Sequence, residues 1–179
     1  MNKNNLIHLI LSLIAFVLAY SIAYLTGIDL VKQVVLYAFL IQWVLFIPAY
    51  IFQTEKFYDL SGSFTYIFVI CYVSYSFYLE NGINIGNIIL GGAIIIWAIR
   101  LGSFLFFRIH NAGEDKRFRN IKPSATRFFM TWTLQGMWVS ICSACALSGI
   151  ANGIEIDSYF YSGLLIFTLG FITEIIADN

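Results

Sequence analysis

Charged residues in this chain are confined to short clusters, and the segments between them are long enough to cross a lipid bilayer. Six windows contain no Asp, Glu, Lys or Arg: residues 4–28, 33–54, 60–79, 81–99, 128–154 and 158–173. A membrane-spanning helix needs about 20 mostly apolar residues. We therefore predict six transmembrane helices, near residues 6–25, 34–53, 62–79, 83–108, 128–150 and 158–177.

The overall composition supports a membrane location. Charged residues make up 11% of the chain and hydrophobic residues 60%, with a mean hydropathy of +0.81, whereas a soluble domain carries about 25% charged residues. The apolar segments lack the alternation of polar and apolar positions that β-barrel strands require. The prediction is an all-α, polytopic transmembrane bundle in which residues 1–179 form a single membrane domain.

The first apolar segment has two interpretations. Lys3 followed by an apolar run, with Ser21-Ile22-Ala23 as a small-residue site, resembles a cleaved signal peptide. The uncharged run is long for that purpose, and Tyr24-Leu25 continue it. We therefore favour a retained first span.

Lysine and arginine are unevenly distributed between the two sides of the predicted bundle. With the N-terminus inside, the cytoplasmic segments hold eight of the ten basic residues: Lys3, Lys56, Arg108, Lys116, Arg117, Arg119, Lys122 and Arg127. Cytoplasmic loops of membrane proteins are enriched in such residues. We expect both termini to be cytoplasmic and the basic loop to face membrane lipids, which leaves no basic surface suited to nucleic acid.

Arg100 is the one charge that falls deep inside a predicted span, away from its ends. A charge within a membrane is costly and persists mainly where it faces the bundle interior and meets a partner. The alternative is that the side chain extends to the membrane surface. At about 1.5 Å rise per residue, Arg100 lies about 12 Å deeper than Arg108. Its side chain would have to extend over most of that depth to reach the surface, which makes the alternative less favourable. Arg100 is therefore a candidate functional residue.

Two further features are candidates. Glu174 and Asp178 are four residues apart and share one face of the last helix. They are either solvated acids at a helix end or partners of Arg100, Arg108 or a cofactor. The basic loop around residues 113–117 either binds lipid head groups or caps a polyphosphate-bearing ligand through bidentate arginine contacts.

The cysteines do not indicate a metal site. Cys142 and Cys145 have C-x-x-C spacing, but they lie in a predicted span without a second pair, and the chain has only His8 and His110 as histidines. A structural zinc site needs four ligands. We predict no metal site and expect both cysteines to be buried structural residues.

Several motifs together resemble the DUF1295 group of the steroid 5-alpha reductase family. They cover residues 55–179 and occur in the expected order: Asp59-Leu60-Ser61-Gly62-Ser63-Phe64-Thr65-Tyr66, Trp97-x-x-Arg100-Leu101-x-x-Phe104-Leu105-x-x-Arg108, Gly113-Glu114-Asp115-x-Arg117, Gln135-Gly136, and Gly170-Phe171-x-x-Glu174-x-x-Ala177-Asp178.

The resemblance implies a membrane reductase in which NADPH enters from the cytoplasmic side and delivers hydride to an activated double bond of an apolar, steroid- or lipid-like substrate. By position, the resemblance implies a cofactor pocket formed by Arg100, Arg108, Arg117, Glu174 and Asp178. It implies a catalytic or substrate-side role for Tyr66.

The chain departs from the family pattern at its end. Family members continue past this point into a segment that bears further cofactor residues, whereas this sequence stops at Asn179. We therefore expect a truncated chain with an incomplete cofactor site and no NADPH binding at micromolar concentration. The alternatives are a catalytically inactive relative, or a relative of the isoprenylcysteine methyltransferase fold that uses S-adenosylmethionine. A transporter is disfavoured, since no pair of helices shows matching Gly/Pro breaks.

Overall fold

The computed structural model describes residues 3–178, and helices are the only regular elements in that range. The long helices are α1 (Lys3–Leu25), α2 (Asp29–Ile51), α3 (Tyr58–Asn81), α4 (Ile85–Ala112), α5 (Ala125–Asn152) and α6 (Ser158–Asp178), with a short 3-10 helix, η1 (Lys116–Asn120), before α5. All six long helices are long and apolar enough to cross a membrane. The prediction of an all-α protein with six spans is confirmed.

The helices extend beyond the apolar windows from which they were predicted. α2 begins at Asp29 rather than near residue 34, and Asp29 forms an ion pair with Lys32 within the first turn. α4 continues past Arg108 to Ala112 and ends where Gly113 takes a φ of +82°, a conformation that glycine adopts readily at helix ends. Charged residues end an apolar window, but they do not end a helix.

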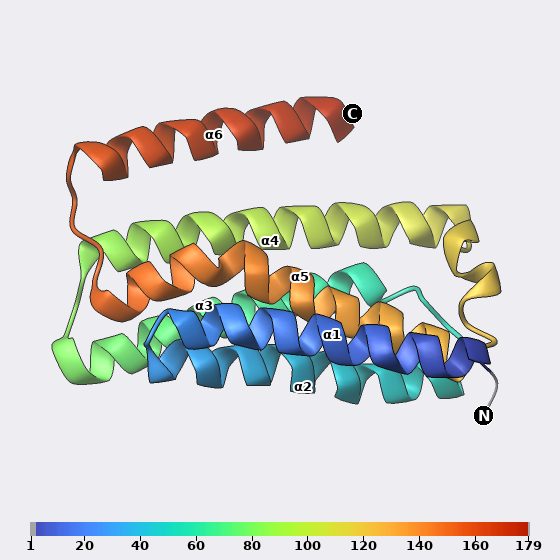
Figure 1. The fold of residues 1–179 in the computed structure, drawn as a ribbon. Coiled ribbons are helices and arrows are strands. Elements are labelled where there is room, and N and C mark those ends of the chain that lie inside the picture. Colours follow the sequence, from blue (N-terminus) through green and yellow to red (C-terminus); the bar gives the residue numbers. More distant parts are fainter. Residues whose placement is uncertain (1–2, 179) are drawn as a thin grey trace.

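α5 lies at the centre of the bundle. It packs against α1, α2 and α3, whereas α4 packs mainly on α3 (Figure 1). The main core joins apolar residues of these helices, among them Val34, Phe39, Ile70 and Leu147. A smaller aromatic cluster joins Phe118 of η1 to Phe128 and Trp132 of α5.

A buried polar network ties α2 to α3 and α5. The Gln42 side chain is fully buried and donates through Nε2 to Thr65 Oγ1 at 2.8 Å. Gln135 donates to the backbone carbonyl of Tyr58 at 3.0 Å. Hydrogen bonds of this kind satisfy polar groups that lipid cannot satisfy, and they hold the first turns of α3 against α5.

α6 differs from the other helices because none of its described residues is buried. Figure 1 shows it lying apart from the other five, on the side of α4. One face of α6 is half-buried and includes Phe160, Leu164, Phe167 and Phe171. The polar contacts of α6 with α4 lie near its C-terminal end.

Candidate functional site

Arg100 joins α4 to the end of α6. Its Nη1 lies 2.8 Å from Glu174 Oε1 and 2.6 Å from Asp178 Oδ2. The first contact is also a hydrogen bond, whereas the second is an ion pair without aligned hydrogen-bond geometry. The four-residue spacing of the two acids places both on the face of α6 that meets α4. Of the alternatives for Arg100, the structure therefore supports the one in which its side chain meets acidic partners.

Trp97 completes this cluster. It lies one turn before Arg100 on α4 and donates its indole Nε1–H to Glu174 Oε2 at 2.9 Å. Both carboxylate oxygens of Glu174 are thereby engaged. Because each partner fixes one oxygen, the carboxylate is held in a single orientation.

Arg108 lies two turns further along the same face of α4. Phe104 stands between the two arginines, with the Arg100 guanidinium 5.3 Å and the Arg108 guanidinium 5.7 Å from its ring centroid. Such contacts are typical of cation–π pairs. Within residues 3–178, Arg108 has no carboxylate at ion-pair distance.

A cavity of about 380 Å³ lies beside the Arg100 cluster, between α3, α4, α5 and α6. Its lining combines aromatic and small apolar residues with a few polar groups, among them Tyr66, Trp97, Cys142, Phe167, Phe171 and Glu174. Ligand sites commonly have this character, with volumes of about 300–1,000 Å³. Tyr66 and Glu174, which are distant in the sequence, thus line one cavity.

The hydroxyl of Tyr66 is buried and makes no well-formed hydrogen bond among the described residues. Its polar neighbour is the thiol of Cys142, which is a weak hydrogen-bonding group. Tyr66 is 8% exposed, and its ring meets Trp97 edge-on, with ring centroids 5.2 Å apart. Leaving a buried polar group unpaired costs about 1–3 kcal/mol. A ligand in the adjoining cavity would remove this cost.

Cys142 and Cys145 correct one sequence expectation. Both are exposed, and Cys142 lines the cavity. The expectation of buried structural cysteines is wrong, because α5 buries other faces, with Ser143 and Leu147 among its buried residues.

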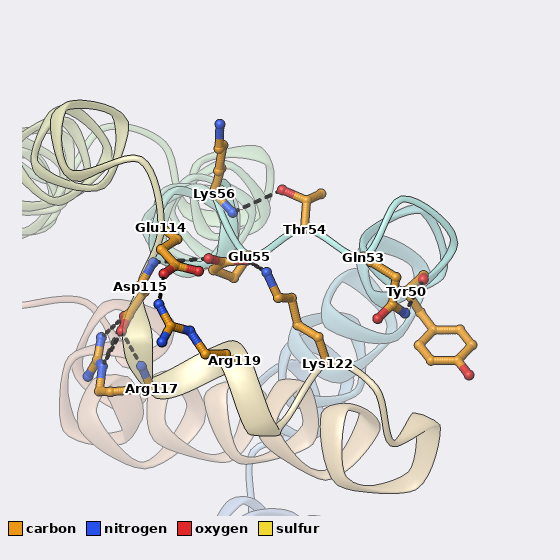
Figure 2. Close-up of polar contacts among 10 residues, drawn as sticks. All are labelled: Tyr50, Gln53, Thr54, Glu55, Lys56, Glu114, Asp115, Arg117, Arg119 and Lys122. Atoms are coloured by element: carbon orange, nitrogen blue, oxygen red, sulfur yellow. Dashed lines mark hydrogen bonds and ion pairs between the residues drawn. The ribbon is translucent and has the colours of Figure 1, made fainter.

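The basic loop forms a separate cluster, shown in Figure 2. Arg117 binds the carboxylate of Asp115, with Nε 3.1 Å from Oδ1 and 2.9 Å from Oδ2, and Arg119 pairs with Glu114. The Arg117 side chain holds the pKa of Asp115 below its usual value. Arg117 and Arg119 thus each form an ion pair with an acid of the same loop.

Glu55 anchors this loop to the connection between α2 and α3. It is 2% exposed, pairs with Lys122, and accepts a hydrogen bond from the backbone N–H of Asp115 at 3.0 Å. Figure 2 shows Glu55 and Lys122 pointing toward each other across the two connections.

The structure brings together four of the six residues proposed from the sequence: Tyr66, Arg100, Glu174 and Asp178. Arg108 stands beyond the end of this group and Arg117 belongs to the loop cluster. Sequence reasoning assigned no role to Trp97 or Glu55. Trp97 lies in the quoted motif and could have been found from its spacing to Arg100, whereas no sequence signal marks Glu55 as buried.

Comparison with known proteins identifies a family but not an activity. The model of a family described as a protein of unknown function (DUF1295) matches residues 45–179. No curated protein and no solved structure matches the chain. The matched range contains all the residues of the Arg100 cluster and the loop cluster.

Proposed function

We infer that this chain, which belongs to the DUF1295 family, is a membrane-embedded reductase that acts with NADPH on an activated C=C bond of an apolar substrate. The observation that carries the proposal is the buried Tyr66 hydroxyl, which has only the weak Cys142 thiol as a polar neighbour and lies at a cavity shared with Trp97 and Glu174. The resemblance to steroid 5-alpha reductases supplies the type of reaction.

The residues at the cavity fit the reactive end of such a cofactor. The carboxylate of Glu174, which lines the cavity, accepts hydrogen bonds and suits the amide group of a nicotinamide. The cavity of about 380 Å³ would take a ring system rather than a whole dinucleotide. Arg108, which has no carboxylate at ion-pair distance among the described residues, would meet a phosphate. When bound, NADPH supplies a hydride.

In this proposal Tyr66 acts on the substrate. Its O–H would donate a hydrogen bond to a carbonyl oxygen conjugated with the double bond, where negative charge develops as the bond is reduced. A donor placed in advance at such an oxygen stabilises the transition state. Arg100 would hold Glu174 in place through their ion pair, and Glu174 would hold Trp97 through their hydrogen bond. The apolar walls formed by Phe167 and Phe171 would exclude water.

Binding of the substrate provides a test that depends only on Tyr66 and the other residues that line the cavity. The full chain, purified in lipid nanodiscs, is titrated with a membrane-soluble conjugated enone, and Tyr66→Phe is compared with Tyr75→Phe, a change at an exposed tyrosine of the same helix. One hydrogen bond contributes about 0.5–1.5 kcal/mol. We therefore expect Tyr66→Phe to weaken binding by about threefold to tenfold, and Tyr75→Phe to leave it unchanged.

Equal binding by wild type and Tyr66→Phe would contradict the assignment of the substrate site. Where enone binding follows the prediction, NADPH oxidation is measured in the same nanodiscs. Binding of the enone without NADPH oxidation would agree with the expectation from the sequence that the chain does not bind NADPH at micromolar concentration, and with the alternative of a catalytically inactive relative.

A further inference from the structure

A larger cavity lies outside the Arg100 cluster, in a groove where α2, α3 and α4 meet. Its volume is about 560 Å³. Exposed apolar residues form its rim, among them Leu60, Phe64 and Ile99. A groove with this rim opens toward the lipid phase of a membrane protein rather than toward an aqueous mouth.

The floor of the groove is made by small residues at the contact between α3 and α4. A Cβ atom on Gly102 would lie 2.4 Å from Ser63 Oγ, so the absence of that atom lets the two helices meet there. Leu45 of α2 and Phe57 of the α2–α3 connection form the opposite wall. The groove is thus built by the packing of three helices.

Two hydroxyls line the groove, and one ammonium group belongs to the residue that precedes the lining residue Phe57. Ser63 and Ser103 line the groove, and neither hydroxyl has a hydrogen-bond partner among the described residues. Lys56, next to Phe57, is exposed and has no carboxylate at ion-pair distance within residues 3–178. Figure 2 shows its side chain pointing away from Glu55 and the loop cluster.

Lys56 and Lys122 differ in their ion pairs, since Lys122 has a carboxylate partner and Lys56 has none within residues 3–178. The acid beside Lys56 in the chain, Glu55, pairs with Lys122 instead. The charges that act on Asp59 are those of Arg117, Asp115 and Arg108, not that of Lys56. An exposed cation next to a lining residue of an apolar groove, with no ion pair to Glu55 or Asp59, complements an anion that carries a hydrocarbon chain.

We propose that this groove binds an anionic phospholipid, with one acyl chain between α3 and α4 and the phosphate at Lys56. The serine hydroxyls would donate to ester oxygens of the same lipid. A basic side chain near a membrane surface favours anionic lipid by roughly fivefold, and the groove adds a defined place for the chain. This proposal does not depend on the reductase assignment.

Native mass spectrometry of the full chain tests it, with phosphatidylglycerol and phosphatidylcholine offered separately. We expect one phosphatidylglycerol to be retained preferentially. Lys56→Gln should lower its retention by about fivefold, whereas Lys116→Gln, at an exposed loop lysine without an ion pair, should not. Ser103→Trp fills the groove and should abolish retention, whereas Leu165→Trp, at an exposed position of α6, should not.

Several outcomes would overturn the proposal. These are equal retention of the two lipids, equal effects of the two lysine changes, and full retention in Ser103→Trp. Displacement of the lipid by millimolar glycerol phosphate would also overturn it, since that result indicates a site for a free anion rather than for a lipid chain.

Discussion

At the scale of single residues, Arg100 is expected to contribute to the stability of the membrane domain through its ion pairs with α6. Replacing it with leucine leaves Glu174 and Asp178 without their cation. Removing one partner of a fully buried pair costs about 3–5 kcal/mol, and this half-buried pair lies at or below the lower end of that range. We expect Arg100→Leu to lower the free energy of unfolding by up to about 3 kcal/mol, measured as a reduced thermal midpoint in detergent. An unchanged or raised midpoint would show that the charge is not needed inside the bundle.

Arg119→Leu is the matched control. Arg119 also pairs with a carboxylate, that of Glu114, but its side chain is 63% exposed. Exposed ion pairs contribute about 0–1 kcal/mol, so the thermal midpoint should change little.

A second residue-scale prediction concerns the loop cluster and pH. Arg117 lowers the pKa of Asp115 in the folded state, so this carboxylate stabilises the fold above its unfolded pKa of about 3.9. That contribution is lost as the pH falls through the lowered folded pKa. Asp115→Asn should therefore destabilise the protein at pH 6, and the difference from wild type should shrink below about pH 4.

Thermal midpoints measured at several pH values between about 6 and 2 would check this. Glu155→Gln, at an exposed acid that lies outside this cluster, is the control and should show no such difference. A destabilisation by Asp115→Asn that stays constant across the pH range would assign the effect to packing rather than to charge.

At the scale of elements, the contact between α3 and α4 depends on the absence of a side chain. Gly102→Ala places a Cβ 2.4 Å from Ser63 Oγ and 2.6 Å from Ser63 Cβ, and the helices must separate to accept it. Overpacking of this kind costs about 1–3 kcal/mol. The expected result is a lower thermal midpoint.

Gly92→Ala, on the same helix, is the control because nothing lies within 4 Å of the added atom. Alanine is favoured over glycine in a helix by about 0.5–1 kcal/mol, so this change should raise the midpoint slightly. Equal effects of the two changes on the thermal midpoint would contradict the close contact between α3 and α4 at Gly102.

At the scale of the whole molecule, the orientation in the membrane remains a prediction. Eight of ten basic residues fall on the side that we expect to be cytoplasmic, in keeping with the general bias of such loops. A topology reporter inserted near Asn120, or fused after the last residue, should therefore report a cytoplasmic location. A readout from the opposite side at Asn120 would reverse the orientation and remove the argument that a cofactor enters from the cytoplasm.

The amino-acid sequence by itself determined the number and type of the spans and the candidacy of Arg100. Both follow from local properties, since the cost of a charge in a membrane depends on the residue and on its distance from the next polar segment. The same reasoning misplaced the starts of α2 and α3 and the end of α4 by several residues. Helix ends reach into the polar interface, where charged side chains are tolerated.

Only the tertiary structure decided which faces of the helices meet. It selected Arg100 rather than Arg108 as the partner of the α6 acids, placed Tyr66 at their cavity, and exposed Cys142. These helices are apolar on most of their surface, so hydrophobic periodicity does not reveal their rotation about their axes. The buried pair of Glu55 and Lys122 joins residues 67 positions apart, and a contact between such distant residues is set by packing rather than by any local pattern.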